Sequence, residues 1–228
     1  MSVAGARVGV LMLAATLLAG ARPMRAQAPA QAPTADERAA LVRRAGMSRA
    51  LGAKDAAVTV YEVADFECPF CAQFASQAFP RIDSAYVKPG RVQWVFVNLP
   101  LVMHANAFQA AEAALCAGAT GDRFWAMHEK LYETQGEWRD AADPQALFLR
   151  YARAAGVPEA PYSACIRAER VWPVIMRDAM YATSAQIDGT PTYIIGNQVA
   201  AVGAKSFDEW RTILDKAIRD AAAKKKQP

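Results

Sequence analysis

The 228-residue sequence is poor in the side chains that build metal sites, and it lacks a long apolar run. It contains two histidines and four cysteines, and only one pair of cysteines is closely spaced, which argues against a zinc site. The formal net charge is only +4, so no excess of charge favours nucleic acid or an anionic membrane as a partner. No internal repeat is present. We therefore expect a globular protein without a bound metal or a nucleic-acid partner.

The first 28 residues have the pattern of a secretory signal peptide. Arg7 supplies a positive charge, and residues 8–19 form an apolar run that is shorter than the ~20 residues a spanning helix needs. Residues 26–28, Ala-Gln-Ala, form a small-x-small cleavage pattern. We expect cleavage after residue 28 and export to the periplasm; an uncleaved membrane anchor is the alternative. Without the arginines of this segment, the net charge falls to +1.

Two β-branched stretches with a helix between them indicate a βαβ unit. Residues 58–63 and 92–97 are the predicted strands, and residues 69–86 are a predicted helix with a kink at Pro80. Residues 51–56, which contain Gly and Asp, are predicted to form a turn.

A helical segment follows this unit. Residues 104–186 are rich in Ala, Glu, Arg, Met and Leu and poor in β-branched runs. Three or four helices are expected there, at about 105–117, 121–134, 144–155 and 162–186. Two short strands joined by a Gly-Asn turn at 196–197 come next, and Ser206 caps a final helix.

This order predicts a mixed α/β protein, a thioredoxin fold interrupted by an inserted α-helical domain. The elements before the insertion form the βαβ half, and those after it form the ββα half. The expected segments are the signal peptide 1–28, the N-terminal leader and helix 29–55, the first part of the thioredoxin domain 56–103, the helical insertion 104–186, and the second part 187–228.

Cys68 and Cys71 lie directly after the first predicted strand, where a helix begins. Cysteines at positions i and i+3 face each other across one helical turn, and their sulfur atoms are close enough to form a disulfide. Pro69 suits the first turn, because its missing N–H leaves no bond unmade there. Free N–H groups and the helix dipole stabilise a thiolate on Cys68. We expect Cys68 to be the attacking thiol and Cys71 the shielded, resolving thiol of a redox-active disulfide that needs no other cofactor.

Two alternatives remain open for this pair: an inert structural disulfide, or part of a zinc or copper site. Two acidic neighbours bear on its reactivity. Asp65 and Glu67 oppose thiolate formation if their carboxylates approach the Cys68 sulfur.

Thr190-Pro191 precedes a predicted strand, where a proline is unusual unless its peptide bond is cis or the loop is special. In a thioredoxin fold a cis-proline loop lies opposite the active-site cysteines. We expect the main chain of Thr190 to pair with an extended substrate, and Pro69 and Phe70 to contact the same substrate. An ordinary trans-proline turn is the alternative.

Glu62 interrupts the first apolar strand, six residues before Cys68. A buried acid is costly unless it has a role. We predict that Glu62 exchanges a proton with Cys71 and has a raised pKa. The alternatives are a hydrated edge of the sheet, or a Lys or Arg partner.

The four cysteines allow three pairings. Cys68 and Cys71 are too close together to staple the chain, which leaves Cys116 and Cys165 for each other. That bond closes a loop of about fifty residues and stabilises the fold by about 4 kcal/mol on the chain-entropy model. Two free thiols are the alternative.

Three blocks of the sequence resemble the DsbA-like periplasmic thiol:disulfide oxidoreductases. The blocks are Asp-Phe-Glu-Cys-Pro-Phe-Cys at 65–71, the helical stretch with Ala-Asn-Ala at 105–107 and Phe-Trp-Ala-Met-His at 124–128, and Gly-Thr-Pro-Thr at 189–192. The resemblance runs from about residue 56 to 215. It implies that Cys68 is the nucleophile, Cys71 the buried cysteine, Pro191 the cis-proline and Glu62 the buried acid.

The resemblance also implies an oxidase of newly exported proteins, recycled by a quinone-linked membrane partner. The sequence departs from the best-known members in two places: Phe70 stands where they have His, and Thr190 where they have Val. The first change removes one contribution to thiolate stability. The second suggests a disulfide isomerase or reductase as an alternative, and a metallochaperone or chaperone is the alternative outside the enzymes. We expect a monomer, because no dimerisation domain precedes the thioredoxin unit.

Overall fold

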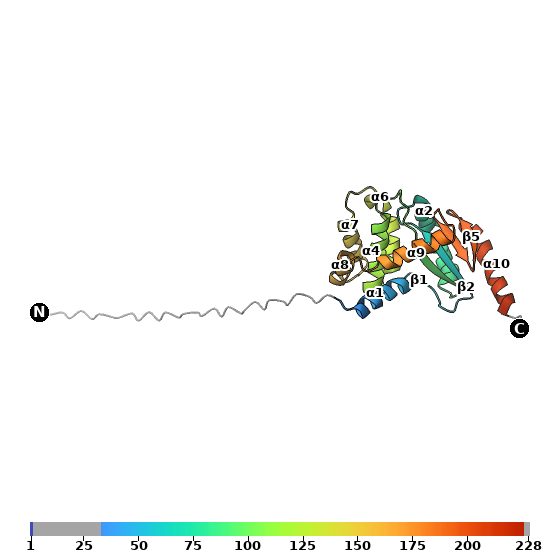
Figure 1. The fold of residues 1–228 in the computed structure, drawn as a ribbon, viewed down its shortest axis with the longest axis horizontal. Helices are drawn as coiled ribbons and strands as arrows, with labels where there is room; N and C mark the ends of the chain where they lie inside the picture. The colour runs from blue at the N-terminus through green and yellow to red at the C-terminus, as the bar shows by residue number, and fades with distance from the viewer. Residues whose placement is uncertain (2–32, 226–228) are drawn as a thin grey trace. The chain divides into compact units, whose positions relative to one another are not determined.

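The structure, a computed structural model, describes Met1 and residues 33–225. Apart from Met1, the predicted signal peptide at 1–28 lies outside the described residues. Figure 1 shows the elements. They are α1 (Ala35–Ser48), β1 (Ala50–Leu51), β2 (Val58–Ala64), α2 (Pro69–Gln77), α3 (Phe79–Ile82), the π-helical turn η1 (Asp83–Val87), β3 (Val92–Asn98), α4 (Ala107–Gly121), α5 (Phe124–Glu133), α6 (Gln135–Trp138), α7 (Gln145–Ala154), α8 (Glu159–Arg167), α9 (Trp172–Ser184), β4 (Thr192–Ile195), β5 (Gln198–Val202) and α10 (Phe207–Lys225).

The strands form one five-stranded sheet in the order β1-β3-β2-β4-β5. β2 and β3 are parallel, as the βαβ unit requires, and the other neighbouring strands are antiparallel. Side chains alternate between the two faces, so Glu62 and Trp94 share one face while Val63 lies on the other. The first face packs against α10 through Trp210, and the second against α9 through Ala182.

Helices α4 to α9 lie between β3 and β4 in the chain and form the insertion. Figure 1 shows α6, α7 and α8 grouped to one side of the sheet, with α4 beside them. Their buried side chains, among them Leu115, Met127 and Trp138, belong to the same core cluster as Phe66 and Cys71. The predicted thioredoxin fold with a helical insertion is confirmed, and the insertion packs directly against the cysteine turn.

The prediction of a single helix over residues 162–186 was wrong. α8 ends at Arg167, and α9 begins at Trp172. Between them Glu169 adopts a φ of +51°, which ends a right-handed helix. Pro173, in the first turn of α9, has no N–H with which to continue the earlier helix.

The helix expected over residues 69–86 is also interrupted. It breaks at Ala78, two residues before Pro80, and continues as α3 and η1. The proline ring removes a main-chain N–H at this point, so the two segments cannot share a regular hydrogen-bond ladder. β1 was missed, because residues 51–56 were expected to form only a turn; it is a two-residue strand at the edge beside β3.

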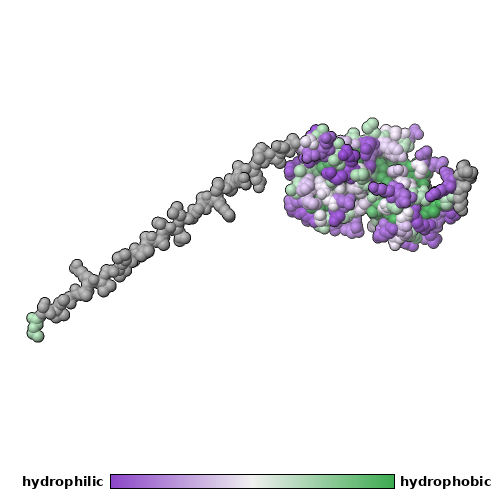
Figure 2. Space-filling view, turned by 90° about the horizontal axis from the view of Figure 1, so that it is seen from below, coloured by the Kyte–Doolittle hydropathy of each residue, from purple (hydrophilic) through white to green (hydrophobic). Residues whose placement is uncertain are grey.

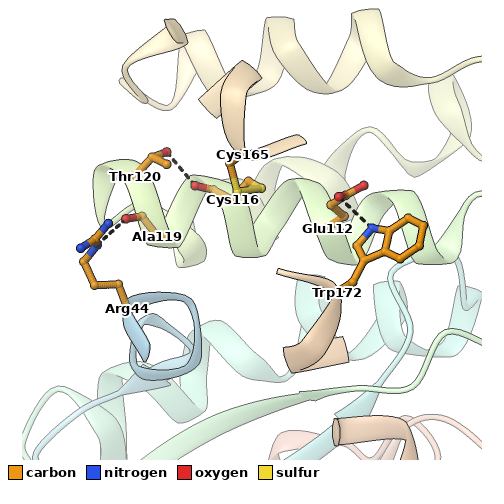
Figure 3. The surroundings of a disulfide bond; sticks show 7 residues. All are labelled: Arg44, Glu112, Cys116, Ala119, Thr120, Cys165 and Trp172. Atoms are coloured by element: carbon orange, nitrogen blue, oxygen red, sulfur yellow. Dashed lines mark hydrogen bonds between the residues drawn. A yellow bond between two sulfur atoms is a disulfide. The ribbon is translucent and has the colours of Figure 1, made fainter. Parts of the chain in front are cut away.

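A disulfide joins Cys116 on α4 to Cys165 on α8, and both residues are fully buried. Figure 3 shows its surroundings, where the Thr120 hydroxyl donates to the carbonyl of Cys116 at 2.7 Å. Further along α4, the carbonyl of Ala119 accepts a hydrogen bond from Arg44 of α1 at 2.9 Å. The disulfide and this bond fasten α8 and α1 to the same helix.

Replacing both Cys116 and Cys165 by Ala should lower the free energy of unfolding by about 4 kcal/mol, because the bond closes a loop with a sequence separation of 49. Denaturant unfolding followed by circular dichroism measures the loss. A variant with Cys68 and Cys71 both replaced by Ala is the control, since those residues close only one turn. A loss below about 1 kcal/mol in the first variant would contradict the chain-entropy argument.

Candidate active site

Cys68 is the N-cap residue of α2, and Cys71 lies one turn inside the helix. Pro69 occupies the first turn, where no main-chain N–H is needed. Both cysteines are free thiols; Cys68 is 4% exposed and Cys71 is completely buried. Cys68 is more enclosed than its place at a helix end led us to expect, yet it is the only one of the pair that an incoming sulfur can reach. Phe70, between the two cysteines, is 59% exposed.

The loop before β4 brings its main chain to the Cys68 sulfur. The Cys68 thiol donates to the carbonyl oxygen of Thr190, with Sγ and O 3.4 Å apart, although the two residues are 122 positions apart in the sequence. The Thr190-Pro191 peptide bond is cis. The Thr190 hydroxyl is buried and has no hydrogen-bond partner among the described residues. It is therefore free to donate to the sulfur when Cys68 ionises.

The two thiols have opposite pKa shifts. A hydrogen bond from the Cys71 thiol is the largest cause that lowers the pKa of Cys68, to about 6; burial opposes it. The Thr190 side chain and the main-chain N–H groups of Cys71 and Phe70 lower it further. Burial, followed by the neighbouring Cys68, raises the pKa of Cys71 well above that of an ordinary thiol. Cys68 is thus the thiolate of the pair and the better leaving group.

The acidic neighbours of Cys68 are both buried and held by main-chain N–H groups. Asp65 accepts from the N–H of Glu67 at 2.7 Å and from that of Leu101 at 2.8 Å, and it contacts His104 Nδ1 at 2.7 Å. Glu67 accepts from the N–H of Asn106 at 2.7 Å. Neither carboxylate is among the causes that shift the pKa of Cys68. The hydrogen bonds to Cys68 therefore outweigh the expected opposition of these two carboxylates.

Glu62 is 1% exposed and points into the core beneath α2. Its Oε2 accepts from the indole N–H of Trp94 at 2.7 Å, and its Oε1 has no partner among the described residues. Burial raises the pKa of Glu62 to about 7, against the lowering effect of Trp94. A Glu62 charge in turn raises the pKa of Cys71. Glu62 therefore lies neither at a hydrated edge of the sheet nor beside a Lys or Arg partner among the described residues.

Two side chains of the insertion hold the carbonyl groups of the loop between β2 and α2. The Tyr132 hydroxyl donates to the carbonyl of Asp65 at 3.3 Å. Gln135 Nε2 donates to the carbonyls of Phe66 at 2.8 Å and Cys68 at 3.1 Å. Sequence reasoning missed both residues, because no spacing or motif relates positions 132 and 135 to the cysteine turn.

Neither histidine stands in a metal-binding cluster. Within residues 33–225, no group of three or more His, Cys, Asp or Glu side chains is arranged to hold a metal ion. His128 is buried among aromatic rings, and burial lowers its pKa to about 3, so it is neutral.

Within residues 33–225, no helix has the length and apolar character needed to cross a membrane.

A family model described as Thioredoxin matches residues 44–216. The chain belongs to the thioredoxin family. Disulfide bond formation protein D of Bacillus subtilis (strain 168) is 27% identical over 173 residues, which cover 74% of this chain and 76% of that protein. Na(+)/H(+) antiporter NhaA 3 of Salinispora tropica is 35% identical over 148 residues, which are 64% of this chain. The match covers 21% of that relative, so it extends over about a fifth of the antiporter.

Solved structures agree with this assignment. Oxidised BdbD from Bacillus subtilis superposes with a TM-score of 0.68 at 27% identity, over 75% of this chain and 92% of that one. Alpha-DsbA1 from Wolbachia pipientis shares the fold, with a TM-score of 0.68 at 22% identity over 77% of this chain and 93% of that one. The resemblance seen in the sequence is confirmed: this thioredoxin-family chain is DsbA-like, and its class is protein-disulfide oxidoreductase.

Replacing Thr190 by Val should raise the pKa of Cys68, because the side chain keeps its branched shape but loses the hydroxyl that stabilises the thiolate. Thiolate absorbance in the ultraviolet, followed against pH, measures the shift. Thr192→Val is the matched control, since the Thr192 hydroxyl donates to the carbonyl of Gly189 at 2.7 Å instead. Equal pKa values in the two variants would count against a role for the Thr190 hydroxyl.

Replacing Glu62 by Gln should change how stability depends on pH. The folded-state pKa of Glu62, about 7, lies above its unfolded value near 4.5. The stabilisation that protonated Glu62 gives the folded state is therefore fully present below pH ~4.5 and is lost as pH rises through ~7. The Glu62→Gln variant has no such loss. Relative to wild type, it should gain ~3 kcal/mol of unfolding free energy between about pH 4 and pH 9.

Urea unfolding across that pH range measures this difference. Glu129→Gln, at an exposed position, is the control and should track wild type. A Glu62→Gln difference that stays constant with pH would mean that the buried carboxyl does not titrate as described.

Proposed function

We propose that the chain donates a Cys68–Cys71 disulfide to reduced, exported client proteins. The observation that carries the proposal is the thiol of Cys68, whose pKa is lowered to about 6 beside the main chain of Thr190. Each unit by which a thiol pKa falls stabilises the reduced pair by about 1.4 kcal/mol, or roughly 30 mV for two electrons. Stabilising the reduced pair makes the disulfide a stronger oxidant.

The reaction consists of two thiol–disulfide exchanges. A client thiolate attacks Cys68 Sγ, forming a client–Cys68 disulfide and releasing Cys71 as a thiolate. Because Cys71 has a raised pKa, it takes up a proton, and Glu62 is the proton donor we propose. The second client thiolate attacks the client sulfur of the mixed disulfide and releases Cys68 as a thiolate. The client loses two electrons, and the enzyme pair gains them.

Client binding in this proposal uses surfaces on both sides of Cys68. The Thr190 main chain, next to Pro191, pairs with an extended client segment, and the exposed Pro69 and Phe70 contact it. Further apolar contacts are available on the loop after β3 and on α9. The exposed side chains there are Val102, Met103, Trp172, Met176 and Met180. Figure 2 views one face of the molecule, on which hydrophilic side chains surround smaller hydrophobic areas.

The setting we propose is the periplasm, reached by an exported chain whose signal peptide is removed after residue 28. A quinone-linked membrane partner reoxidises the pair, the protein works as a monomer, and the Cys68–Cys71 disulfide carries out the exchange without a further cofactor. A disulfide isomerase or reductase is the second candidate, because Thr190 stands before the cis-proline. A reduction potential near the oxidising extreme favours the oxidase, and a thioredoxin-like value favours the reductase.

Cys68→Ser should abolish disulfide donation. Cys71→Ala should accumulate mixed disulfides between Cys68 and clients that already hold a disulfide, because no enzyme thiol remains to release Cys68 from them. Oxidation of a reduced test protein and non-reducing electrophoresis measure the two outcomes. The variant with Cys116 and Cys165 both replaced by Ala should still donate, since that disulfide is buried away from the turn. Wild-type donation by Cys68→Ser would refute the proposal.

A further inference from the structure

Gln135 connects the insertion to the main chain at Cys68. It is the first residue of α6 and is 8% exposed. Its single amide group donates to two carbonyls, those of Phe66 at 2.8 Å and Cys68 at 3.1 Å. The Cys68 carbonyl also accepts the N–H of Ala72 at 3.1 Å, a main-chain bond at the start of α2. One amide from the insertion therefore binds the redox helix at its N-cap.

A closed set of hydrogen bonds fixes that amide in place. The Asn106 side-chain amide donates to three carbonyls in the segment 138–141, where α6 ends, at 2.9 to 3.0 Å. The main-chain N–H of Asn106 donates to Glu67 Oε2 at 2.7 Å. Glu67 directly precedes Cys68, so these hydrogen bonds link α6 to the residue before Cys68, just as Gln135 links α6 to Cys68 itself. Glu67, Asn106 and Gln135 are 7%, 5% and 8% exposed, so water does not compete strongly for these bonds.

The orientation of these peptide groups determines what the Cys68 sulfur faces. Carbonyl oxygens carry partial negative charge, and N–H groups carry partial positive charge. While Gln135 holds the carbonyls of Phe66 and Cys68, the N–H groups of Phe70 and Cys71 stay directed toward the sulfur. Without the amide, the Phe66 carbonyl loses its buried donor and the Cys68 carbonyl keeps only the N–H of Ala72, a cost that a shift of the main chain at residues 66–68 relieves.

We propose that Gln135 is a positioning residue for the exchange reaction: its amide holds the Cys68 main chain so that the sulfur faces Thr190 and the N–H groups of α2. The helical insertion then acts on the nucleophile itself, in addition to covering it. The inference rests on the proposed role of Cys68 as the attacking thiol.

Two substitutions separate the amide from the shape of the side chain. Gln135→Met keeps the length and volume but removes both donors, and Gln135→Glu places carboxylate oxygens opposite the two carbonyls. Alkylation of Cys68 by iodoacetamide, followed against pH, reports its thiolate without any client. The pKa of Cys68 should rise from wild type to Gln135→Met and again to Gln135→Glu. A rise of about half a unit slows alkylation about threefold at a pH below the pKa.

Tyr151→Phe is the matched control, because it removes another hydrogen bond within the insertion, the 2.8 Å bond to Glu137. It should alkylate at the wild-type rate. Thermal unfolding identifies any variant that does not fold; if Gln135→Met fails, Gln135→Glu carries the same test. A wild-type rate in a folded Gln135 variant overturns the proposal, and so does an equal shift in Tyr151→Phe. Failure of disulfide donation alone, with the pKa order as expected, would count against the oxidase function and not against this inference.

Discussion

The buried passage of the chain from β2 into α2 is the constraint on which the site depends. Residues 65–68 leave the sheet and enter the helix with little contact with water, so each polar group needs a partner inside the protein. Main-chain N–H groups satisfy the carboxylates of Asp65 and Glu67, and Tyr132 and Gln135 satisfy the carbonyls. With its polar groups paired, the segment is held in one conformation, and that conformation sets the cysteine pair at the helix end.

The same burial has different consequences for the groups it encloses. Cys68 has enough hydrogen-bond donors around it to offset the loss of water, so its pKa falls. Cys71 and Glu62 do not, and their pKa values rise. Exchange needs this asymmetry, because one sulfur must leave readily while the other must be protonated and kept out of reach.

The insertion and the sheet are also joined away from the cysteines. Asp178 on α9 forms a buried ion pair with Arg49 and accepts from the side-chain amide of Asn98, at the end of β3, at 2.8 Å. α9 then leads into the loop of Thr190 and Pro191. Both walls of the site, the loop at residues 65–68 and the cis-proline loop, are therefore anchored by residues of the insertion or of its last helix.

Local patterns in the sequence were sufficient for the regular elements and for the chemistry of the cysteine turn. The Val-rich strands, the Cys-Pro-Phe-Cys turn with proline in the first helical turn, and the Ser206 cap depend on contacts within a few residues, which sequence spacing reports directly. The sequence-based predictions failed where an element depends on a contact with a distant part of the chain, or where a helix ends without a Gly or Pro at its last turn. The division near Glu169 and the edge strand β1, which forms only against β3, are the examples.

The sequence by itself determined that the chain is an α/β protein with a helix-terminal dithiol, because helix and strand periodicity and the i, i+3 spacing are local properties. Only the tertiary structure decided how that dithiol is tuned. The Thr190 carbonyl lies 122 positions from Cys68, and Gln135 lies 67 positions from it. Hydrogen bonds and desolvation depend on distance in space and on exclusion of water, and neither is written in the order of residues along the chain.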